Sequence, residues 1–400
     1  MQFFQDAATI VCIFVTRCST DKSNVLAASF NKKTYHGDFI NEVQNALQTF
    51  PPETFAEEPW SIRPTLHTSI LNKMDSFKTA LKDLPIDIYR GVLTGFNDAF
   101  IIGGETRNSL ISEDDNSAEL IKPLLRGRDI TPWSAVCQDL YLINTHNGLK
   151  EKNIPPVNID NYPAVKKHLD QYIVDLTKRG DKGDTPYNLR NCAYLEEFAK
   201  PKIIYPEITN GFPFCYDETG MFCNNKAFII TAKDELVSLK YLTAIFNSKL
   251  VKLWIWYKCP ELLGGTREIR KAYFENLRIP DANNAELAAL ADKMLTLNAD
   301  LQQKVSRFLR RITETYNLEK TTAALETFYT LSFSDFVKEL GKQKVKLTLV
   351  QKDELEDYFN AYQAECQSLK TAIATTDHEI DRMVYALYGL TDEEIGVVEN

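Results

Sequence analysis

The chain has 400 residues, 44% of them hydrophobic and 25% charged, which is ordinary for a globular protein of two or three domains. No apolar run reaches the roughly 18 residues that a membrane helix needs. The strand-sized run Ala8–Val15 lacks the basic leader and the cleavage site of a signal peptide. We therefore expect neither a membrane partner nor export.

The net charge of −9 is concentrated at one end of the chain. The last fifty residues carry three basic and twelve acidic side chains, and the residues before them are neutral overall. Residues 249–280 carry seven basic side chains against three acidic ones. A basic stretch within a neutral body can form a phosphate-binding face, although a merely solvated surface explains the charge equally well.

Eight cysteines are scattered along the chain, and no two of them form a CxxC pair. This spacing argues against a zinc ribbon. Without an export signal, free thiols in a reducing compartment are the expected state, so the sequence predicts a cytoplasmic protein.

The N-terminal 85 residues are predicted to hold one buried strand and two helices. The run TIVCIFV within residues 2–17 is β-branched, aromatic and bounded by polar residues, which is typical of a strand in a larger sheet. Helices are expected at Asp38–Gln48 and Leu66–Leu81, with the proline-rich patch FPPETFAEEPWSIRP between them.

Residues 86–280 are predicted to form an α+β domain with a mixed sheet. Short strands are expected at Ala99–Ile102, Leu140–Ile143, Lys202–Tyr205 and Ala227–Thr231. Helices are expected at Ala118–Leu125, Ala164–Lys178 and Leu236–Trp254. The polar loop Arg179–Asn191 is a candidate for binding or for movement.

Residues 281–400 change in character. Apolar residues recur at spacings of three and four from Leu287 to Ile312, and again from Leu355 to Leu387. This heptad pattern predicts two long helices, and an antiparallel, coiled-coil-like pair is the economical arrangement. Residues 313–350, helical in part, would connect them. The alternative is two amphipathic helices that pack separately on a globular body.

The sequence contains no complete catalytic constellation. The loop GxxxxGK[ST], the fingerprint GxGxxG, the elbow GxSxG and the zinc pair HExxH are all absent. The Asn-Pro-Pro-aromatic motif of amino-group methyltransferases is missing, and no (D/E)xK follows Pro280-Asp281 at the spacing of a metal-dependent nuclease. Whether the chain is an enzyme is thus left open, and no cofactor or metal ligand is predicted within it.

The stretch Tyr89–Ile102, YRGVLTGFNDAFII, has the composition of a recognition loop. Its glycines permit close backbone approach, and Thr94 and Asn97 place short polar side chains beside exposed amides. Arg90 offers a fork for a phosphate or a guanine edge. A tight structural turn is the alternative, and for Asn97 a loop lock without ligand contact is as good an interpretation.

Further basic residues follow in SAELIKPLLRGRDI, KPKIIYPEI, FNSKLVKLWIW and LLGGTREIRKAYFENLRIP. Lys122 and Arg126 would share one face of a helix that Gly127 ends, and Arg128 would project from the turn after it. The complete set of candidate DNA-binding residues is Arg90, Thr94, Asn97, Lys122, Arg126, Arg128, Lys202, Lys249, Arg267, Arg270 and Lys271.

The ordered set of these motifs resembles the C-terminal specificity domain of TaqI-type adenine methyltransferases and of fused type IIG restriction-modification enzymes. The matching stretches are Ile88–Ile102, Ile121–Ile130, Lys200–Ile208, Asn247–Leu250 and Gly264–Pro280. Residues Ile380–Ile395 are also similar to the closing helix of such enzymes. The resemblance covers residues 86–280 strongly and residues 281–400 moderately.

The resemblance implies a module that recognises double-stranded DNA and clamps it against a methyltransferase domain or subunit. That partner would transfer a methyl group from S-adenosylmethionine to N6 of a flipped-out adenine. Residues 1–85 would be the end of the methyltransferase domain plus a linker, residues 86–280 the DNA target-recognition domain, and residues 281–400 a helical spacer or C-terminal helical domain.

The same resemblance places the cofactors outside this chain. The motifs for S-adenosylmethionine and adenine would lie upstream of Met1, and Mg²⁺ would serve the parent enzyme if it also cuts DNA. Two other functions stay open. One is an assembly subunit whose helical pair docks a separate methyltransferase or nuclease subunit, similar to the spacer helices of type I specificity subunits. The other is a metal-dependent nuclease that uses Asp114, Asp115 or Glu119, although these acids suit a turn and a helix cap better.

Overall fold

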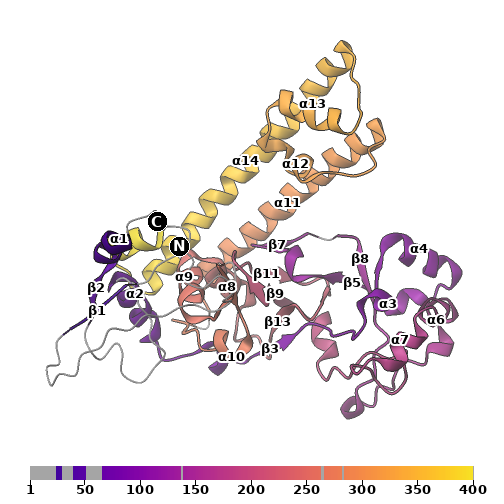
Figure 1. Ribbon diagram of the computed structural model, residues 1–400, viewed down its shortest axis with the longest axis horizontal. Helices are drawn as coiled ribbons and strands as arrows, with labels where there is room; N and C mark the ends of the chain where they lie inside the picture. The colour runs from indigo at the N-terminus through magenta and orange to yellow at the C-terminus, as the bar shows by residue number, and fades with distance from the viewer. Residues whose placement is uncertain are drawn as a thin grey trace.

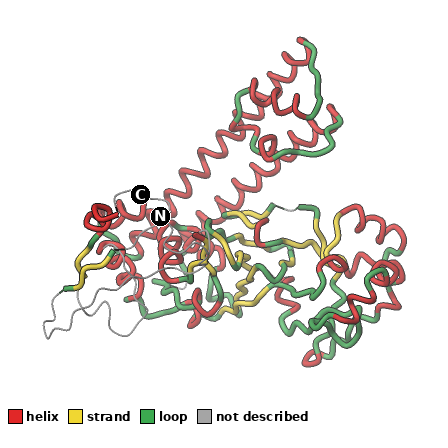
Figure 2. The backbone as a smooth tube through the Cα atoms, viewed as in Figure 1, coloured by secondary structure: helices red, strands yellow, loops and turns green. Residues whose placement is uncertain are grey.

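In the computed structural model of the chain, residues 24–28, 39–50, 65–136, 138–262, 265–281 and 283–399 are described. The strand predicted within residues 2–17 and most of the proline-rich patch lie outside these residues. Two long helices rise as an arm from a body in which the strands are concentrated, as Figures 1 and 2 show.

A four-stranded antiparallel sheet forms the centre of the body. Its strands lie in the order β11 (Cys215–Asp217), β9 (Lys202–Pro206), β13 (Ala227–Ala232) and β3 (Ile86–Arg90). Side chains alternate between two hydrophobic cores, so that Ile203 and Tyr205 lie in one core and Ile204 lies in the other. The sheet is therefore covered on both faces, which explains why its strands read as almost continuous apolar runs.

Helices cover the first face of this central sheet. The first core contains side chains of α8 (Leu239–Asn247), α9 (Lys249–Lys258) and α2 (Thr65–Asp75). The same core takes in the lower ends of the two arm helices, through Leu287 of α11 (Ala285–Tyr316) and Val384 of α14 (Leu349–Leu387). The arm is thus rooted in the body by shared apolar contacts and is not a separate appendage.

A second lobe covers the other face, and we call it the distal lobe. Its sheet has the order β12 (Phe222–Cys223), β5 (Ile121–Leu125), β8 (Leu140–Ile143) and β4 (Ile101–Gly103). Its helices are α3 (Asn97–Phe100), α4 (Gly104–Glu113), α5 (Ser117–Leu120), α6 (Pro163–Asp170) and α7 (Ile173–Lys178). These elements form the right-hand end of the body in Figure 1.

Three smaller groups of strands complete the described part. One is a three-stranded sheet of β10 (Ile208–Thr209), β15 (Thr266–Glu268) and β14 (Glu261–Leu262), followed by the short helix α10 (Lys271–Phe274). The others are the hairpin of β6 (Ile130–Thr131) and β7 (Ser134–Ala135), and the pair of β1 (Val25–Ala27) and β2 (Gln48–Phe50), which α1 (Phe39–Ala46) connects in the sequence.

The two arm helices confirm the predicted antiparallel pair. Together with the sheets of the body, they confirm the predicted α+β class. Helices α11 and α14 contain 32 and 39 residues, which corresponds to lengths of about 48 and 58 Å. Lys293 pairs with Glu379 at 3.6 Å near the base, and Lys304 pairs with Glu365 further out. The short helices α12 (Ala323–Glu326) and α13 (Phe333–Lys342) close the far end over an aromatic cluster of Phe308, Phe328, Phe336 and Phe359.

The prediction of a helix at Ala118–Leu125 is wrong beyond Leu120. The helix α5 ends at Leu120, and Ile121–Leu125 form strand β5, in which Lys122 lies opposite Leu142 of β8. Pro123 explains the difference, because proline lacks an amide donor and disfavours helical geometry in the residue before it. Lys122 and Arg126 therefore do not share a helical face.

Other predicted elements differ mainly at their boundaries. The helix predicted at Ala164–Lys178 is divided into α6 and α7, and the one predicted at Leu236–Trp254 into α8 and α9. In the second case Ser248 ends α8 and caps α9 by accepting a hydrogen bond from the Val251 amide. The predicted strand at Ala99–Ile102 begins only at Ile101, after the single turn α3, and strand β3 was not predicted.

The C-terminal helix α15 (Asp392–Glu399) is clamped against α2 by one carboxylate. Glu394 accepts hydrogen bonds from the Ser69 hydroxyl (2.8 Å), the Lys73 ammonium (2.6 Å) and the Thr391 amide (2.8 Å). Burial alone would raise the pKa of Glu394, but these donors outweigh it and hold that pKa at about 2. The contact fixes the end of the chain to the helix that precedes the central sheet.

Two chemical features of the described residues bear on the expectations from composition. Among the described helices, none combines the length and apolarity that crossing a bilayer requires. The cysteines that the structure describes, Cys192, Cys215, Cys223, Cys259 and Cys366, are free thiols.

The aromatic cluster at the end of the arm leads to a first prediction. Replacing Phe359, which is fully buried with its ring 4.9 Å from that of Phe336, by alanine should cost about 3–5 kcal/mol in the stability of the arm tip. Limited proteolysis of the tip measures this, since cleavage tracks the population of the open form. Val350→Ala, at a position 66% exposed, is the control and should change stability by less than about 0.5 kcal/mol.

The clamp at Glu394 predicts a pH dependence. Because its folded-state pKa lies below the ordinary value of 4.5, the interaction stabilises the fold fully above pH 4.5 and is lost as the pH falls through about 2. Glu394→Gln should therefore weaken the docking of α15 by about 1–3 kcal/mol at pH 7, and the difference should shrink towards pH 2. Hydrogen exchange of the α15 amides measures this. The exposed neighbour Glu393→Gln is the control, and an equal effect there would contradict the assignment.

Candidate nucleic-acid interface

The turn between β12 and β13, residues 224–226, gathers the ends of three other strands. Hydrogen bonds run from donor amide to acceptor carbonyl from Gly91 to Ala227 (2.8 Å), from Asn224 to Leu125 (3.0 Å) and from Glu207 to Lys226 (2.9 Å). The ends of β3, β5 and β9 consequently meet at one place, where the central sheet joins the sheet of the distal lobe.

A buried carboxylate at this junction organises three cations. The side chain of Glu207 is 4% exposed, and its two oxygens accept hydrogen bonds from Nη2 of Arg90 at 2.9 and 3.1 Å. The Lys226 ammonium and Nε of Arg270 each lie 3.9 Å from the same carboxylate. Buried charges are tolerated when they are paired, so Glu207 and its neighbours hold one another in place.

The three cations keep much of their surface open to a ligand. The side chains of Arg90, Lys226 and Arg270 are 47%, 62% and 56% exposed. Arg270 also pairs with Glu268 at 2.7 Å, so that two carboxylates stand against three cations at the junction. Lys271, exposed beside Arg270 at the start of α10, adds a further positive charge. We call these four basic residues the cationic junction.

A tight turn formed by residues 126–129 borders the cationic junction, and we call it the arginine turn. Asp129 is buried and binds Arg126 through both Nε and Nη2, each at 2.9 Å, and through the Arg126 amide at 2.8 Å. A Cβ at Gly127 would lie 2.8 Å from the Lys226 carbonyl, so only glycine fits this approach without a shift. Arg128 is exposed, and no ion pair or hydrogen bond of its side chain is found among the described residues.

The glycine-rich opening stretch is a lock between loops. The buried guanidinium of Arg179 donates to the carbonyls of Thr94 and of Asn188, the latter at 2.6 Å, and lies over the ring of Phe100. Burial lowers the pKa of Arg179 to about 10. Thr94 is 3% exposed, and its hydroxyl donates to Asn97 at 2.6 Å. The geometry thus assigns Thr94 to the lock, whereas Asn97 is exposed.

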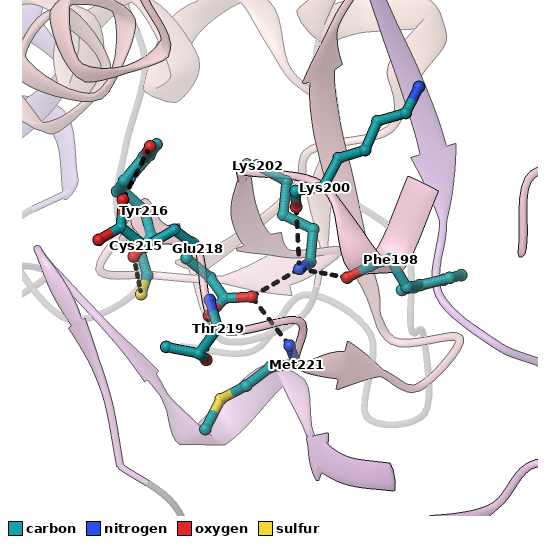
Figure 3. Close-up of polar contacts among 9 residues, drawn as sticks. Phe198, Lys200, Lys202, Cys215, Tyr216, Glu218, Thr219 and Met221 are labelled. Carbon is teal, nitrogen blue, oxygen red and sulfur yellow. Dashed lines mark hydrogen bonds and ion pairs between the residues drawn. The ribbon is translucent and has the colours of Figure 1, made fainter. Parts of the chain in front are cut away.

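Lys202, a candidate DNA-binding residue, is buried and cannot contact DNA in this structure. Figure 3 shows its ammonium deep among polar groups of the β9–β11 region, where it donates to the Phe198 carbonyl at 2.7 Å and pairs with Asp217 at 2.5 Å. Its side chain is 0% exposed. This lysine satisfies a buried network and offers no charge to a ligand.

Arg267 and Lys249 are also used elsewhere. Arg267 is 5% exposed, stacks on Trp256 with its guanidinium 3.9 Å from the ring centroid and donates from Nε to the Trp256 carbonyl. Lys249 pairs with Glu399 of α15, and its amide donates to Asp381 of α14, so it belongs to the base of the arm. Lys122 lies half-buried in the sheet of the distal lobe.

The structure therefore brings together Arg90, Arg126, Arg128, Arg270 and Lys271 from the predicted set. It adds Lys226 and Glu207, which were not predicted. Glu207 stands in the stretch KPKIIYPEI, but only basic residues were predicted to bind there. A glutamate directly after a buried apolar strand was the available signal, because such a charge needs partners.

Two of the three acids of the nuclease alternative, Asp114 and Glu119, accept structural hydrogen bonds. Asp114 accepts hydrogen bonds from the Asn116 amide and the Ser117 hydroxyl, and Glu119 accepts one from the Tyr162 hydroxyl at 3.1 Å. Within the described part of the chain, no three His, Cys, Asp or Glu side chains gather as a metal site requires.

Comparison with known protein families assigns the segment that carries most of this junction. Residues 122–279 match the family profile of the TaqI-like C-terminal specificity domain. This segment is similar to the TaqI-like specificity domain. The matched range includes the arginine turn, Glu207, Lys226 and Arg270, and the predicted resemblance is confirmed over residues 122–279. Residues 280–384, which include most of the arm, match a domain of unknown function (DUF8810).

Two curated relatives of the chain are type II methyltransferases. M.BstVI of Geobacillus stearothermophilus is 22% identical over 284 residues, which is 67% of this chain and 46% of that protein. M.PaeR7I of Pseudomonas aeruginosa is 22% identical over 233 residues, which is 57% of this chain and 38% of that protein. The chain thus matches less than half the length of either relative.

Two solved structures of restriction enzymes are similar to the chain. One is the type IIL restriction-modification enzyme MmeI in complex with DNA, with a TM-score of 0.46 and 12% identity, covering 80% of this chain and 35% of that one. The other is the type IIG restriction endonuclease BpuSI, with a TM-score of 0.41 and 16% identity, covering 62% of this chain and 30% of that one.

The meeting point of the strands at residues 224–226 leads to a prediction about Gly91. A Cβ there would lie 2.0 Å from the Asn224 carbonyl oxygen, so Gly91→Ala must displace the turn that unites the strands. We expect a loss of about 1–3 kcal/mol in unfolding free energy, measured by urea denaturation. Gly103→Ala is the matched control, because nothing lies within 4 Å of its Cβ position. Equal losses in the two variants would contradict the close approach at Gly91.

Proposed function

We propose that this chain is the DNA target-recognition module of a restriction-modification enzyme that methylates adenine at N6. The observation that carries the proposal is the cationic junction, in which Lys226, Arg270 and Lys271 lie in the segment similar to the TaqI-like specificity domain and Arg90 lies before it. Phosphate contacts from Lys and Arg supply much of the affinity of proteins for duplex DNA, and they fix its register. Four exposed or half-exposed cations at one end of the central sheet suit that task.

The acidic residues near the C-terminus lie away from the junction. Glu394 pairs with Lys73 of α2, and Glu399 pairs with Lys249 of α9, so neither carboxylate is part of the junction. Binding of duplex DNA at the cationic junction therefore does not require a phosphate to approach these carboxylates.

The methyl transfer itself is assigned to a partner. The central sheet is antiparallel throughout, whereas nucleotide-type cofactors bind at the carboxyl ends of parallel strands. This contrast supports the assignment of S-adenosylmethionine to a methyltransferase domain or subunit, and we assign Mg²⁺ to the parent enzyme if it also cuts DNA. The curated relatives are named as methyltransferases, which supports this assignment. A cytoplasmic location stays a prediction from the sequence.

The proposal predicts salt-dependent binding of duplex DNA by the purified chain. The logarithm of the affinity should fall linearly with the logarithm of the salt concentration. Lys226→Ala combined with Lys271→Ala should reduce that slope by about 1.8, at about 0.9 for each phosphate that is no longer neutralised. Fluorescence anisotropy with a random duplex at several salt concentrations measures both quantities.

A matched control uses a lysine far from the junction. Lys346→Ala removes an exposed charge beside the arm tip and should leave the slope unchanged. If the folded chain binds no duplex DNA at low salt, the proposed function is wrong. If Lys346→Ala lowers the slope as much as the double variant does, DNA binds elsewhere on the molecule.

A further inference from the structure

We propose that Arg128 is the residue of this interface that reads a guanine, through O6 and N7 in the major groove, while the cationic junction holds phosphates. The inference rests on the proposed function and assigns a specificity-determining residue within it. The reason lies in how many donors of each guanidinium are still available.

Bidentate recognition of guanine needs two N–H donors from one guanidinium, presented together along one edge. Arg90 has its Nε–Nη2 edge occupied, because Nε donates to the Asn225 carbonyl at 2.9 Å and Nη2 donates to Glu207. Arg126 has the same edge occupied by Asp129. Protein acceptors thereby fix the guanidinium of each of these two arginines. Turning either one to face a base edge would break these contacts, whereas a phosphate oxygen can be reached from the remaining N–H groups.

The other two arginines near the junction are restricted as well. Nη2 of Arg270 donates to Glu268 at 2.7 Å, and its Nε faces Glu207 at 3.9 Å. Arg267 is buried against Trp256, and its Nε and Nη1 donate to backbone carbonyls. Among the arginines of the junction and its border, Arg128 alone has no donor of its guanidinium engaged within the described part of the chain.

The backbone beneath Arg128 is held more firmly than the side chain. The Asp129 carboxylate binds the Arg126 amide, the Asp129 amide donates to the Arg126 carbonyl at 2.9 Å, and the Val136 amide donates to the Asp129 carbonyl at 2.8 Å. Gly127 packs against the Lys226 carbonyl. A reading side chain on a rigid support loses less conformational entropy on binding than one on a mobile loop.

The position of the arginine turn beside the cationic junction suits separate contacts, with phosphates at the junction and a base edge at the turn. Gly127 touches the backbone of Lys226, so phosphates held by Lys226 and Arg90 would place a neighbouring base edge near the next residue along the turn, Arg128. Contacts to phosphates position a protein on DNA, and contacts to base edges specify the sequence.

The test is a selection of bound sequences from a random duplex pool, followed by titration of the selected duplex and of a shuffled duplex. It compares the wild-type chain with Arg128→Ala and Arg128→Lys. We expect the wild type to select a guanine that neither variant selects. The affinity of both variants for the selected duplex should fall roughly 5- to 100-fold, and their affinity for the shuffled duplex should fall less than about 3-fold. Lysine should not rescue, because its point charge has no fork.

Two controls separate reading from charge. Lys226→Ala should weaken both duplexes alike, and Arg310→Ala, an exposed arginine on α11, should weaken neither. Methylation of the selected guanine at N7 should weaken the wild type and leave Arg128→Ala unchanged, because only a contact to N7 is blocked.

Several outcomes would overturn the inference. Equal losses on the two duplexes in Arg128→Ala, or full discrimination in Arg128→Lys, would make Arg128 a phosphate contact. Binding by the wild type without any selected sequence would overturn the reading role and leave the proposed DNA binding intact. Absence of binding by the wild type would refute the proposed function itself, and the reading role with it.

Discussion

The candidate interface depends on the burial of one carboxylate, that of Glu207. Its amide and carbonyl tie β9 to the turn before β13 and to Ile269, while its side chain holds Arg90 and faces Lys226 and Arg270. Three cations so close together would repel one another strongly without it. Because a buried carboxylate is costly unless it is paired, the cations are equally necessary for Glu207. The strand ends that meet at Glu207 and the exposed cations around it therefore depend on one another.

Other buried charged side chains of the body join neighbouring strands and loops. Lys202 and Asp217 join β9 to β11, Arg179 joins the loop at Thr94 to the loop at Asn188, and Asp129 holds Arg126. In each case the donors of the cation are directed at acceptors inside the protein. Breaking a buried ion pair such as Lys202–Asp217 is strongly destabilising. The body thus separates its basic side chains into those that fix the backbone and those that remain open. Simple counts of Lys and Arg along the sequence cannot make that distinction.

Elements set by local sequence patterns could be predicted, whereas those set by contacts between distant residues could not. The arm was predictable, since a spacing of three and four from Leu287 to Ile312 is a local pattern that survives folding unchanged. The strands at Leu140–Ile143, Lys202–Tyr205 and Ala227–Thr231 were predictable for the same reason. Strand β5 was missed because its pairing with β8 and the effect of Pro123 outweigh a helix-like pattern. Of the candidate DNA-binding residues, Arg90, Arg126, Arg128, Arg270 and Lys271 lie near one another, and their binding to DNA stays a prediction. Lys202, Lys249 and Arg267 are held by Asp217, Glu399 and Trp256, partners that no local pattern reveals.

The arm and the interface are linked through the first core, and this link limits how the parts can move. Leu287 and Val384 of the arm lie in the same cluster as Ile203 and Tyr205 of strand β9, whose next residues are Pro206 and Glu207. Close-packed cores transmit displacement because they have few voids to absorb it. A partner that pulls on the arm near its base would therefore act on the strand that carries Glu207, whereas a partner at the tip acts first on the separate aromatic cluster around Phe308. The base of the arm, and not its aromatic tip, thus shares a hydrophobic core with the strand that leads to Glu207.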